Sequence, residues 1–393
     1  MRKQIIVVVA VYALTCYQTL GAAPFIPETD DQVLERLPLS GNPAASELRR
    51  MRKQLQEAPE NLALALQLAN RYLALARAES DPRYLGYAQA ALRPWWDLAT
   101  PPPEVLLLRA TVRQNRHEFD AALTDLAQVL KQQPRNAQAR LTAAVIQQVR
   151  GDYGAAMRHC LALLSLSDSL VATACVSSVA SLTGHAEHAL AVLRQALEDR
   201  GDEIGREERL WAMTLLAEIA VRTGKIQEAG QYFKEALALA SNDAYLLGAY
   251  ADFLLDQDQA NETRDLLKEH TRIDGLLLRL ALAEQRLAMP GLAERIASLE
   301  ARFAASRMRG ESLHQGEEAR FTLRLLEQPT AALRLAQSNW AVQREPRDAR
   351  GLLEAAWAAR DSSAASPVLK WLKQSHLEDV RLAALAAQFE GKP

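Results

Sequence analysis

The apolar and polar positions follow a helical pattern along nearly the whole chain. In residues 210–243, small and apolar residues recur at 3.6-residue spacing on both sides of a turn centred on Gly224. Glycine tolerates the left-handed backbone of a tight turn, so the stretch predicts two antiparallel amphipathic helices. Ala217 and Ala229 are small where these two helices have to cross closely. Residues 210–243 are therefore predicted to form one helical hairpin.

The same pattern recurs with a measurable period. The small residue early in the second helix falls at Ala122, Ala156, Ala189, Ala229 and Thr263, with offsets of 34, 33, 40 and 34. Twelve residues before each of them stand Ala110, Ala144, Ser177, Ala217 and Ala251, and four residues after stand Leu126, Cys160, Leu193, Phe233 and Leu267. The turns carry Gly151, Gly184 and Gly224, with His117 in the first hairpin and Asp258 in the fifth. The longer offset indicates an insertion at residues 199–208.

This signature resembles the tetratricopeptide repeat (TPR), a 34-residue helical hairpin with small residues at the crossing, glycine at the turn and alanine early in the second helix. The resemblance is clear over residues 103–270 and fades beyond His270, where helix pairs continue without the signature. It implies an all-α fold, a right-handed superhelical solenoid of antiparallel hairpins in which each hairpin buries its second face against its neighbours.

The remaining segments are divided by proline breaks and by the helical pattern. We expect a signal peptide at 1–22, an extended leader at 23–45, divergent capping helices at 46–102, clear repeats at 103–270, and divergent helix pairs with a C-terminal capping helix at 271–393. Helices are predicted at 46–57, 61–78, 81–96, 274–287, 291–308, 313–327, 330–344, 349–360, 366–374 and 377–389.

The first residues have the three parts of a secretory signal peptide. Arg2 and Lys3 precede an apolar run at 5–14, and small residues follow up to Ala22, where we expect cleavage. The apolar run is short for a permanent membrane span. The pattern predicts export, to the periplasm or as a secreted protein.

Two alternatives would keep the chain at a membrane. One is lipid attachment at Cys16, although Thr15 stands where a lipobox has Gly, Ala or Ser. The other is an uncleaved N-terminal anchor. Membrane association is expected only through one of these two routes, and the oligomeric state is left open.

Composition and charge narrow the partner classes. The chain of 393 residues is 49% hydrophobic and 24% charged, which is typical of a globular protein. Its formal charge is only −2, so there is no overall basic field for nucleic acid or an anionic membrane. We expect no nucleic-acid partner.

The sequence has no motif of catalytic specificity. It contains no GxxxxGK, GxSxG or HExxH motif and no pair of CxxC units. His185 and His188 are three residues apart, but two ligands are too few for a specific metal site. We therefore predict a non-enzyme without a metal or cofactor.

Two cysteines remain after signal removal. The register places Cys160 on the second helix of one hairpin and Cys175 on the first helix of the next, and these helices pack together. A disulfide between them is geometrically possible in an oxidising compartment. The alternative is a pair of small buried hydrophobic residues.

The resemblance to TPR proteins implies a binding surface on the concave face. The positions carried over onto this face, and predicted as the binding site, are Gln114, Asn115, Gln138, Gln148, Trp211, Thr214, Glu218, Arg222, Tyr245, Asp252 and Asp256. The cluster of Lys, Arg and Asn with which some TPR proteins hold a terminal carboxylate is absent. Trp211 and Tyr245 are candidate aromatic anchors, or are partly buried at hairpin junctions.

These observations favour an exported, non-catalytic interaction scaffold. It would bind a peptide or protein on its concave face and take part in an envelope assembly. The alternative is a glycan- or peptidoglycan-binding accessory protein of a polysaccharide enzyme system, and a third possibility is a structural spacer.

Overall fold

The computed structural model describes residues 43–166, 170–201, 204–310 and 315–390. The predicted signal peptide and nearly all of the predicted leader lie outside the described residues. Contacts divide the chain into residues 1–47 and residues 48–393, and the arrangement described below is that of the second unit.

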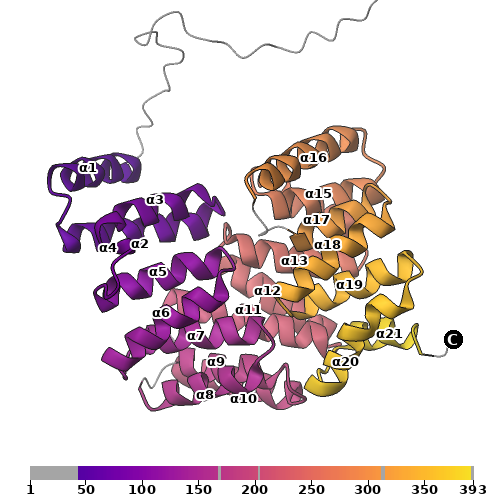
Figure 1. The fold of residues 1–393 in the computed structure, drawn as a ribbon. Helices are drawn as coiled ribbons and strands as arrows, with labels where there is room; N and C mark the ends of the chain where they lie inside the picture. The colour runs from indigo at the N-terminus through magenta and orange to yellow at the C-terminus, as the bar shows by residue number, and fades with distance from the viewer. Residues whose placement is uncertain (1–42, 167–169, 202–203, 311–314, 391–393) are drawn as a thin grey trace, which may run out of the picture. The chain divides into compact units, whose positions relative to one another are not determined.

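The described residues form helices and no strand, and Figure 1 shows these helices following one another as antiparallel neighbours. Before the repeats come α1 (Pro43–Glu57), α2 (Leu62–Glu79), α3 (Arg83–Ala91) and α4 (Arg93–Trp96). The five predicted hairpins are α5 (Pro103–Asn115) with α6 (Phe119–Gln132), α7 (Ala137–Val149) with α8 (Tyr153–Leu164), α9 (Leu170–Ala180) with α10 (Ala186–Arg200), α11 (Arg206–Arg222) with α12 (Ile226–Leu239), and α13 (Ala244–Asp256) with α14 (Ala260–Leu267).

The C-terminal third continues in helices. They are α15 (Asp274–Arg286), α16 (Leu292–Met308), α17 (Gln315–Arg324), α18 (Pro329–Val342), α19 (Pro346–Ala358), the short 3₁₀ helix η2 (Ser362–Ala365), α20 (Ser366–Ser375) and α21 (Val380–Ala387). Each predicted helix of this region has a counterpart whose ends differ by a few residues.

The repeat register is confirmed by burial. The fifteen residues that define it, three in each hairpin, expose at most 2% of their surface. The reason is steric, because two helices approach closely only where their facing side chains are small, and the larger residue one turn further on fills the groove beside them. The all-α solenoid predicted from the sequence is thus the observed architecture.

Two local predictions were wrong. The first helix begins at Pro43 rather than at Ser46, since proline suits the first turn of a helix. The helix predicted at 81–96 is broken at Leu92, because Pro94 lacks an N–H and its ring clashes with the preceding turn. The insertion at 199–208 is partly helical, because α10 extends to Arg200 and α11 begins at Arg206.

A disulfide joins two neighbouring hairpins. Cys160 on α8 and Cys175 on α9 are bonded, with their Cα atoms 5.4 Å apart. Both side chains are buried in the apolar layer between these helices. The bond therefore fixes the second repeat to the third.

The C-terminal helices return to the repeats instead of continuing away from them. The backbone N–H of Arg344, just after α18, donates a 2.7 Å hydrogen bond to the carbonyl of Val149 at the end of α7. On the N-terminal side, α2 contacts α13 of the fifth hairpin. Figure 1 shows the C-terminal helix α20 near α10, which belongs to the third hairpin.

This return explains where the repeat turns carry glycine. Gly184 and Gly224 have φ of +78° and +77°, and a Cβ at either would meet the C-terminal segment, 3.2 Å from His376 Cβ and 3.6 Å from a methyl of Val380 respectively. A Cβ added at Gly151 would likewise lie 3.3 Å from the Cδ of Arg344. The turn at Asp258 also has a positive φ, but its side chain is 95% exposed. Glycine thus stands where the C-terminal segment covers the turn.

Replacing one of these glycines should destabilise the fold. We expect Gly184→Ala to lower the free energy of unfolding by about 1–2 kcal/mol, because it adds both left-handed strain and a clash with His376. The matched control is Gly86→Ala within α3, where an added Cβ meets no atom within 4 Å. This substitution should raise the free energy of unfolding by about 0.5–1 kcal/mol, because alanine is favoured over glycine inside a helix. Urea unfolding followed by circular dichroism measures both, and equal effects would contradict the account.

The disulfide gives a second stability test. Replacing Cys160 and Cys175 together by Ala should lower the free energy of unfolding by about 3 kcal/mol, because the bond closes a loop with a sequence separation of 15. Wild-type protein kept in reductant should approach the double variant in the same urea titration. Alkylation of either cysteine in unreduced, denatured protein would show that the bond does not form.

Candidate binding cavity

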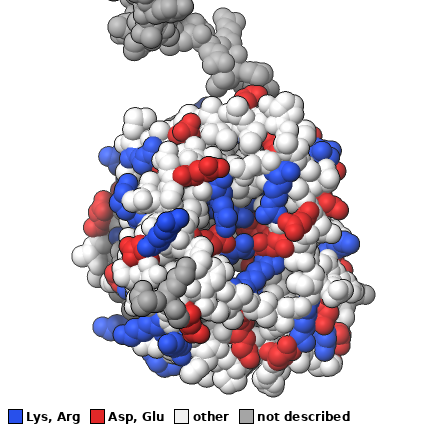
Figure 2. All heavy atoms as spheres, turned by 90° about the vertical axis from the view of Figure 1, so that its right-hand side faces the viewer, with Lys and Arg blue, Asp and Glu red and all other residues white. Residues whose placement is uncertain are grey.

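The described helices surround a large, partly open cavity of about 1320 Å³. Its wall is built mainly from four parts of the chain: the end of α2 and the start of α3, the first helices of the repeats, residues 269–279 with Arg309 and Glu317, and the C-terminal segment from Arg344 to Leu382. Figure 2 shows basic and acidic side chains gathered around a hollow on the face turned to the viewer. The cavity therefore depends on the return of the C-terminal helices.

The wall is highly charged, and its basic residues are all arginines among the described lining residues. The arginines are Arg77, Arg83, Arg222, Arg272, Arg279, Arg309, Arg344, Arg347, Arg350 and Arg381. The acidic residues are Glu79, Asp81, Glu218, Asp243, Asp252, Asp256, Glu269, Asp274, Glu317, Glu345 and Asp379. Guanidinium groups are planar and donate several hydrogen bonds in fixed directions, which suits pairing with carboxylates.

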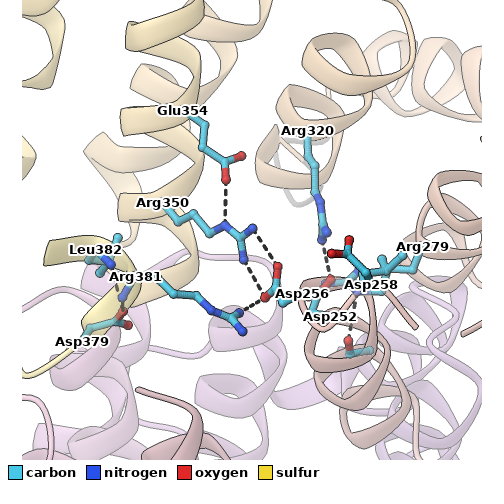
Figure 3. Close-up of polar contacts among 12 residues, drawn as sticks. Asp252, Asp256, Asp258, Arg279, Arg320, Arg350, Glu354, Asp379, Arg381 and Leu382 are labelled. Carbon is cyan, nitrogen blue, oxygen red and sulfur yellow. Dashed lines mark hydrogen bonds and ion pairs between the residues drawn. The ribbon is translucent and has the colours of Figure 1, made fainter. Parts of the chain in front are cut away.

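Two carboxylates on α13 form the centre of this wall. Asp252 and Asp256 are one helical turn apart on one face, where like charges repel. Asp252 accepts from Arg279 on α15 at 2.6 Å and from Arg320 on α17 at 2.5 Å, as Figure 3 shows. Burial opposes ionisation of Asp252, but the two guanidiniums outweigh it and hold the pKa of this carboxyl well below its usual value.

Asp256 is paired with the C-terminal helices. Arg350 on α19 donates to both of its oxygens, at 2.8 and 2.9 Å, and Arg381 on α21 donates to one of the same oxygens (Figure 3). Arg350 also donates to Glu354 at 2.8 Å. Breaking the bidentate pair of Arg350 with Asp256 would leave an uncompensated buried charge, so this pair holds α19 against α13.

A second acidic group lies on α11. Glu218 accepts a 2.6 Å hydrogen bond from the hydroxyl of Tyr245. Tyr245 is 53% exposed and lines the cavity. Burial raises the pKa of Glu218, and the charge of Glu218 raises the pKa of Tyr245 well above its ordinary value. Tyr245 therefore remains a protonated hydrogen-bond donor at neutral pH.

Polar side chains from successive repeats lie next to Glu218 and Tyr245 along the cavity wall. Arg222 donates to the hydroxyl of Ser181 at 2.7 Å, and Ser178 donates to Gln148 at 2.9 Å. The Nε of Arg222 is buried and has no hydrogen-bond partner among the described residues.

Seven of the eleven predicted site residues line the cavity: Asn115, Gln148, Glu218, Arg222, Tyr245, Asp252 and Asp256. Four do not. Gln114 is partly buried away from the cavity wall, and Gln138 is exposed and bonded to Thr142 on its own helix. Thr214 is buried with its hydroxyl on the carbonyl of Leu210. Trp211 packs between apolar clusters at a hairpin junction, so it is a packing residue rather than an anchor at the cavity wall.

The sequence pattern missed the basic half of the site. Arg320, Arg350 and Arg381 lie in the region where the repeat signature fades, and no register indicated which way they point. The available signal was the pair Asp252 and Asp256, because two carboxylates at helical spacing on a concave face need cations from elsewhere.

No group of His, Cys, Asp and Glu residues in the described part of the chain is arranged to hold a metal ion. Six of the acidic residues of the wall are instead paired with arginines: Asp81, Asp252, Asp256, Asp274, Glu317 and Glu345. None of the described helices has the length and apolar character of a membrane span.

No protein-family model and no curated protein matches the chain. Similar solved structures include a tetratricopeptide repeat protein from Parabacteroides merdae (14% identity, TM-score 0.38, 60% of this chain and 91% of that one). Others are the human IFIT1 dimer with m7Gppp-AAAA (11%, 0.44, 89% and 87%) and the APC/C hetero-tetramer Cut9-Hcn1 (14%, 0.41, 88% and 86%). These likenesses concern the fold. The buried register of five hairpins, observed in this chain itself, makes the described residues an all-α solenoid of TPR-like hairpin repeats.

A buried carboxyl lies just behind the cavity wall, at the start of α19. Asp348 accepts from the Nδ2 of Asn339 at 2.8 Å and from the backbone N–H of Glu345 at 3.1 Å. Burial, with the charge of Glu345 in addition, raises the pKa of Asp348 to about 7. The folded protein therefore binds a proton here more tightly than the unfolded chain does.

This shift predicts the pH dependence of stability. The stabilisation due to Asp348 is fully present below the ordinary carboxyl pKa and is lost as pH rises towards about 7, by up to roughly 1.4 kcal/mol per pH unit. Urea midpoints of wild type and Asp348→Asn across this range isolate the effect, since other groups cancel in the difference. The midpoint of the wild type should fall relative to the variant as pH rises. A constant difference would contradict the raised pKa.

Proposed function

We propose that the protein is a non-catalytic scaffold that holds a charged segment of a partner protein in its cavity. The observation that carries this proposal is the wall itself, which presents guanidiniums and carboxylates side by side. Small-molecule pockets are mostly apolar and have volumes of roughly 300–1,000 Å³. A cavity of about 1320 Å³ with so many charges suits a length of polypeptide better.

The proposal extends to the compartment. The charged, apolar and small-residue parts of the N-terminal segment support export, and the Cys160–Cys175 disulfide fits an oxidising environment. We place the scaffold in the periplasm or outside the cell, with a partner that belongs to an envelope assembly.

A glycan-binding role has less support. Sugar rings pack on exposed aromatic faces, and Tyr245 is the one exposed Phe, Tyr or Trp among the described lining residues. Trp211, the other candidate for such contacts, is committed to the hairpin junction. We therefore rank the polypeptide partner first and keep the glycan as an outcome of the test.

Fluorescence anisotropy with labelled synthetic peptides tests the proposal. The probes are alternating Glu/Lys, Glu/Ser, Lys/Ser and Gly/Ser peptides long enough to cross the cavity, with soluble peptidoglycan fragments as competitors. At least one charged peptide should bind more tightly than the Gly/Ser peptide, and added salt should weaken it because charge pairs are screened.

The matched variants are Tyr245→Ala and Tyr87→Ala. Both tyrosines are exposed, but only Tyr245 faces the cavity. Tyr245→Ala should weaken binding about tenfold, while Tyr87→Ala leaves it unchanged. Equal affinity for all four peptides would overturn the proposal, and peptidoglycan binding that alone depends on Tyr245 would favour the glycan.

A further inference from the structure

The segment 376–382, here called the clasp, crosses the turns of the third and fourth hairpins. His376 and Val380 cover the two turn glycines described above. Between them, the carboxylate of Glu378 accepts from the backbone N–H of Ala186, at the first position of α10. An acidic group is favourable there because the first N–H groups of a helix lack partners within the helix. The clasp thus rests on backbone features of two repeats.

The last contact of the clasp is an ion pair that faces the cavity. Arg381 donates to Asp256 and lines the cavity together with Asp379 and Arg350. About a quarter of its side chain, 27%, is exposed. Burial lowers the pKa of the Arg381 guanidinium, because part of this side chain is removed from water.

Asp256 does not depend on Arg381 for its own compensation. Arg350 already occupies both oxygens of this carboxylate in a bidentate pair. If Arg381 turns to another anion, Asp256 keeps a complete partner and no buried charge is orphaned. The cost that usually prevents a buried ion pair from exchanging is therefore absent here.

The neighbouring pair shows the contrast. Arg279 and Arg320 each take a separate oxygen of Asp252, and Arg279 also donates to the carbonyl of Gly248. Removing either arginine would leave one oxygen of Asp252 without its guanidinium. Among the arginines paired with these two aspartates, Arg381 is the redundant one.

We propose that Arg381 captures an acidic side chain of the bound segment, and that its transfer from Asp256 to this side chain releases the clasp from the turns of the repeats. This inference rests on the proposed function and names the chemistry of the partner, a segment rich in Glu or Asp. Binding at the cavity is thereby coupled to the opening of its C-terminal wall.

Binding of the Glu/Ser and Lys/Ser peptides to the full chain tests the capture. The Glu/Ser peptide should bind, and Arg381→Gln should weaken it about tenfold. Arg381→Lys keeps the positive charge but lacks the planar guanidinium, so its affinity for the Glu/Ser peptide should fall between that of the wild type and that of Arg381→Gln. The matched control is Arg194→Gln, which removes an arginine paired with Glu228 outside the cavity and should not change the affinity.

Hydrogen–deuterium exchange of the same proteins tests the release. Saturating Glu/Ser peptide should speed exchange in residues 376–389 and at the N–H of Ala186, and should leave α5 and α6 unchanged. Arg381→Gln without peptide should speed exchange in the same residues, because this substitution removes the contact between residue 381 and Asp256. A uniform rise across residues 48–393 would instead indicate a purely structural role and would contradict the proposal.

The outcomes separate this inference from the proposed function. If the Lys/Ser or Glu/Lys peptide binds and the Glu/Ser peptide does not, the scaffold proposal survives and capture by Arg381 is wrong. If the Glu/Ser peptide binds equally well to Arg381→Gln, or slows exchange in the clasp, the inference is again wrong while the scaffold stands. If no charged peptide binds in preference to Gly/Ser, both are wrong.

Discussion

The structure depends on the neutralisation of two carboxylates, Asp252 and Asp256, that one face of α13 presents to the interior. Each repels the other, and neither has a cation on its own helix within reach. The arginines that compensate them come from α15, α17, α19 and α21, so the charge balance of one repeat requires the C-terminal third to fold back over it. The cavity, its charged wall and the covered turns follow from this requirement.

The repeats were predictable because their information is local. A hairpin needs a small residue at each crossing point and a larger apolar residue one turn later, and this requirement recurs with the period of the structure. Ser177 and Thr263 satisfy it as well as alanine does, since size rather than polarity decides at these positions. The turns at His117 and Asp258 likewise adopt the same left-handed backbone as the glycine turns.

The candidate site was only half predictable, for the same physical reason. Asp252, Asp256 and Tyr245 could be placed on the concave face from the register, but their partners follow no period. Arg350 and Arg381 are ordinary helix residues in sequence, and their direction is set by packing between helices far apart in the chain. Trp211 shows the opposite limit, because it holds the same register position as Tyr245, which lines the cavity, and yet it packs against apolar clusters.

The hydrogen bond from Arg344 to Val149 has a consequence for how the chain acquires its structure. In an open solenoid each hairpin contacts only its neighbours, so folding can begin anywhere and spread in either direction. Here the last helices need several completed hairpins as their docking surface, and bringing residues so distant in sequence together has an entropic cost that grows with the intervening length. Synthesis from the N-terminus forms that surface first. Closure is then the final step of folding, and its high contact order makes it a slow one.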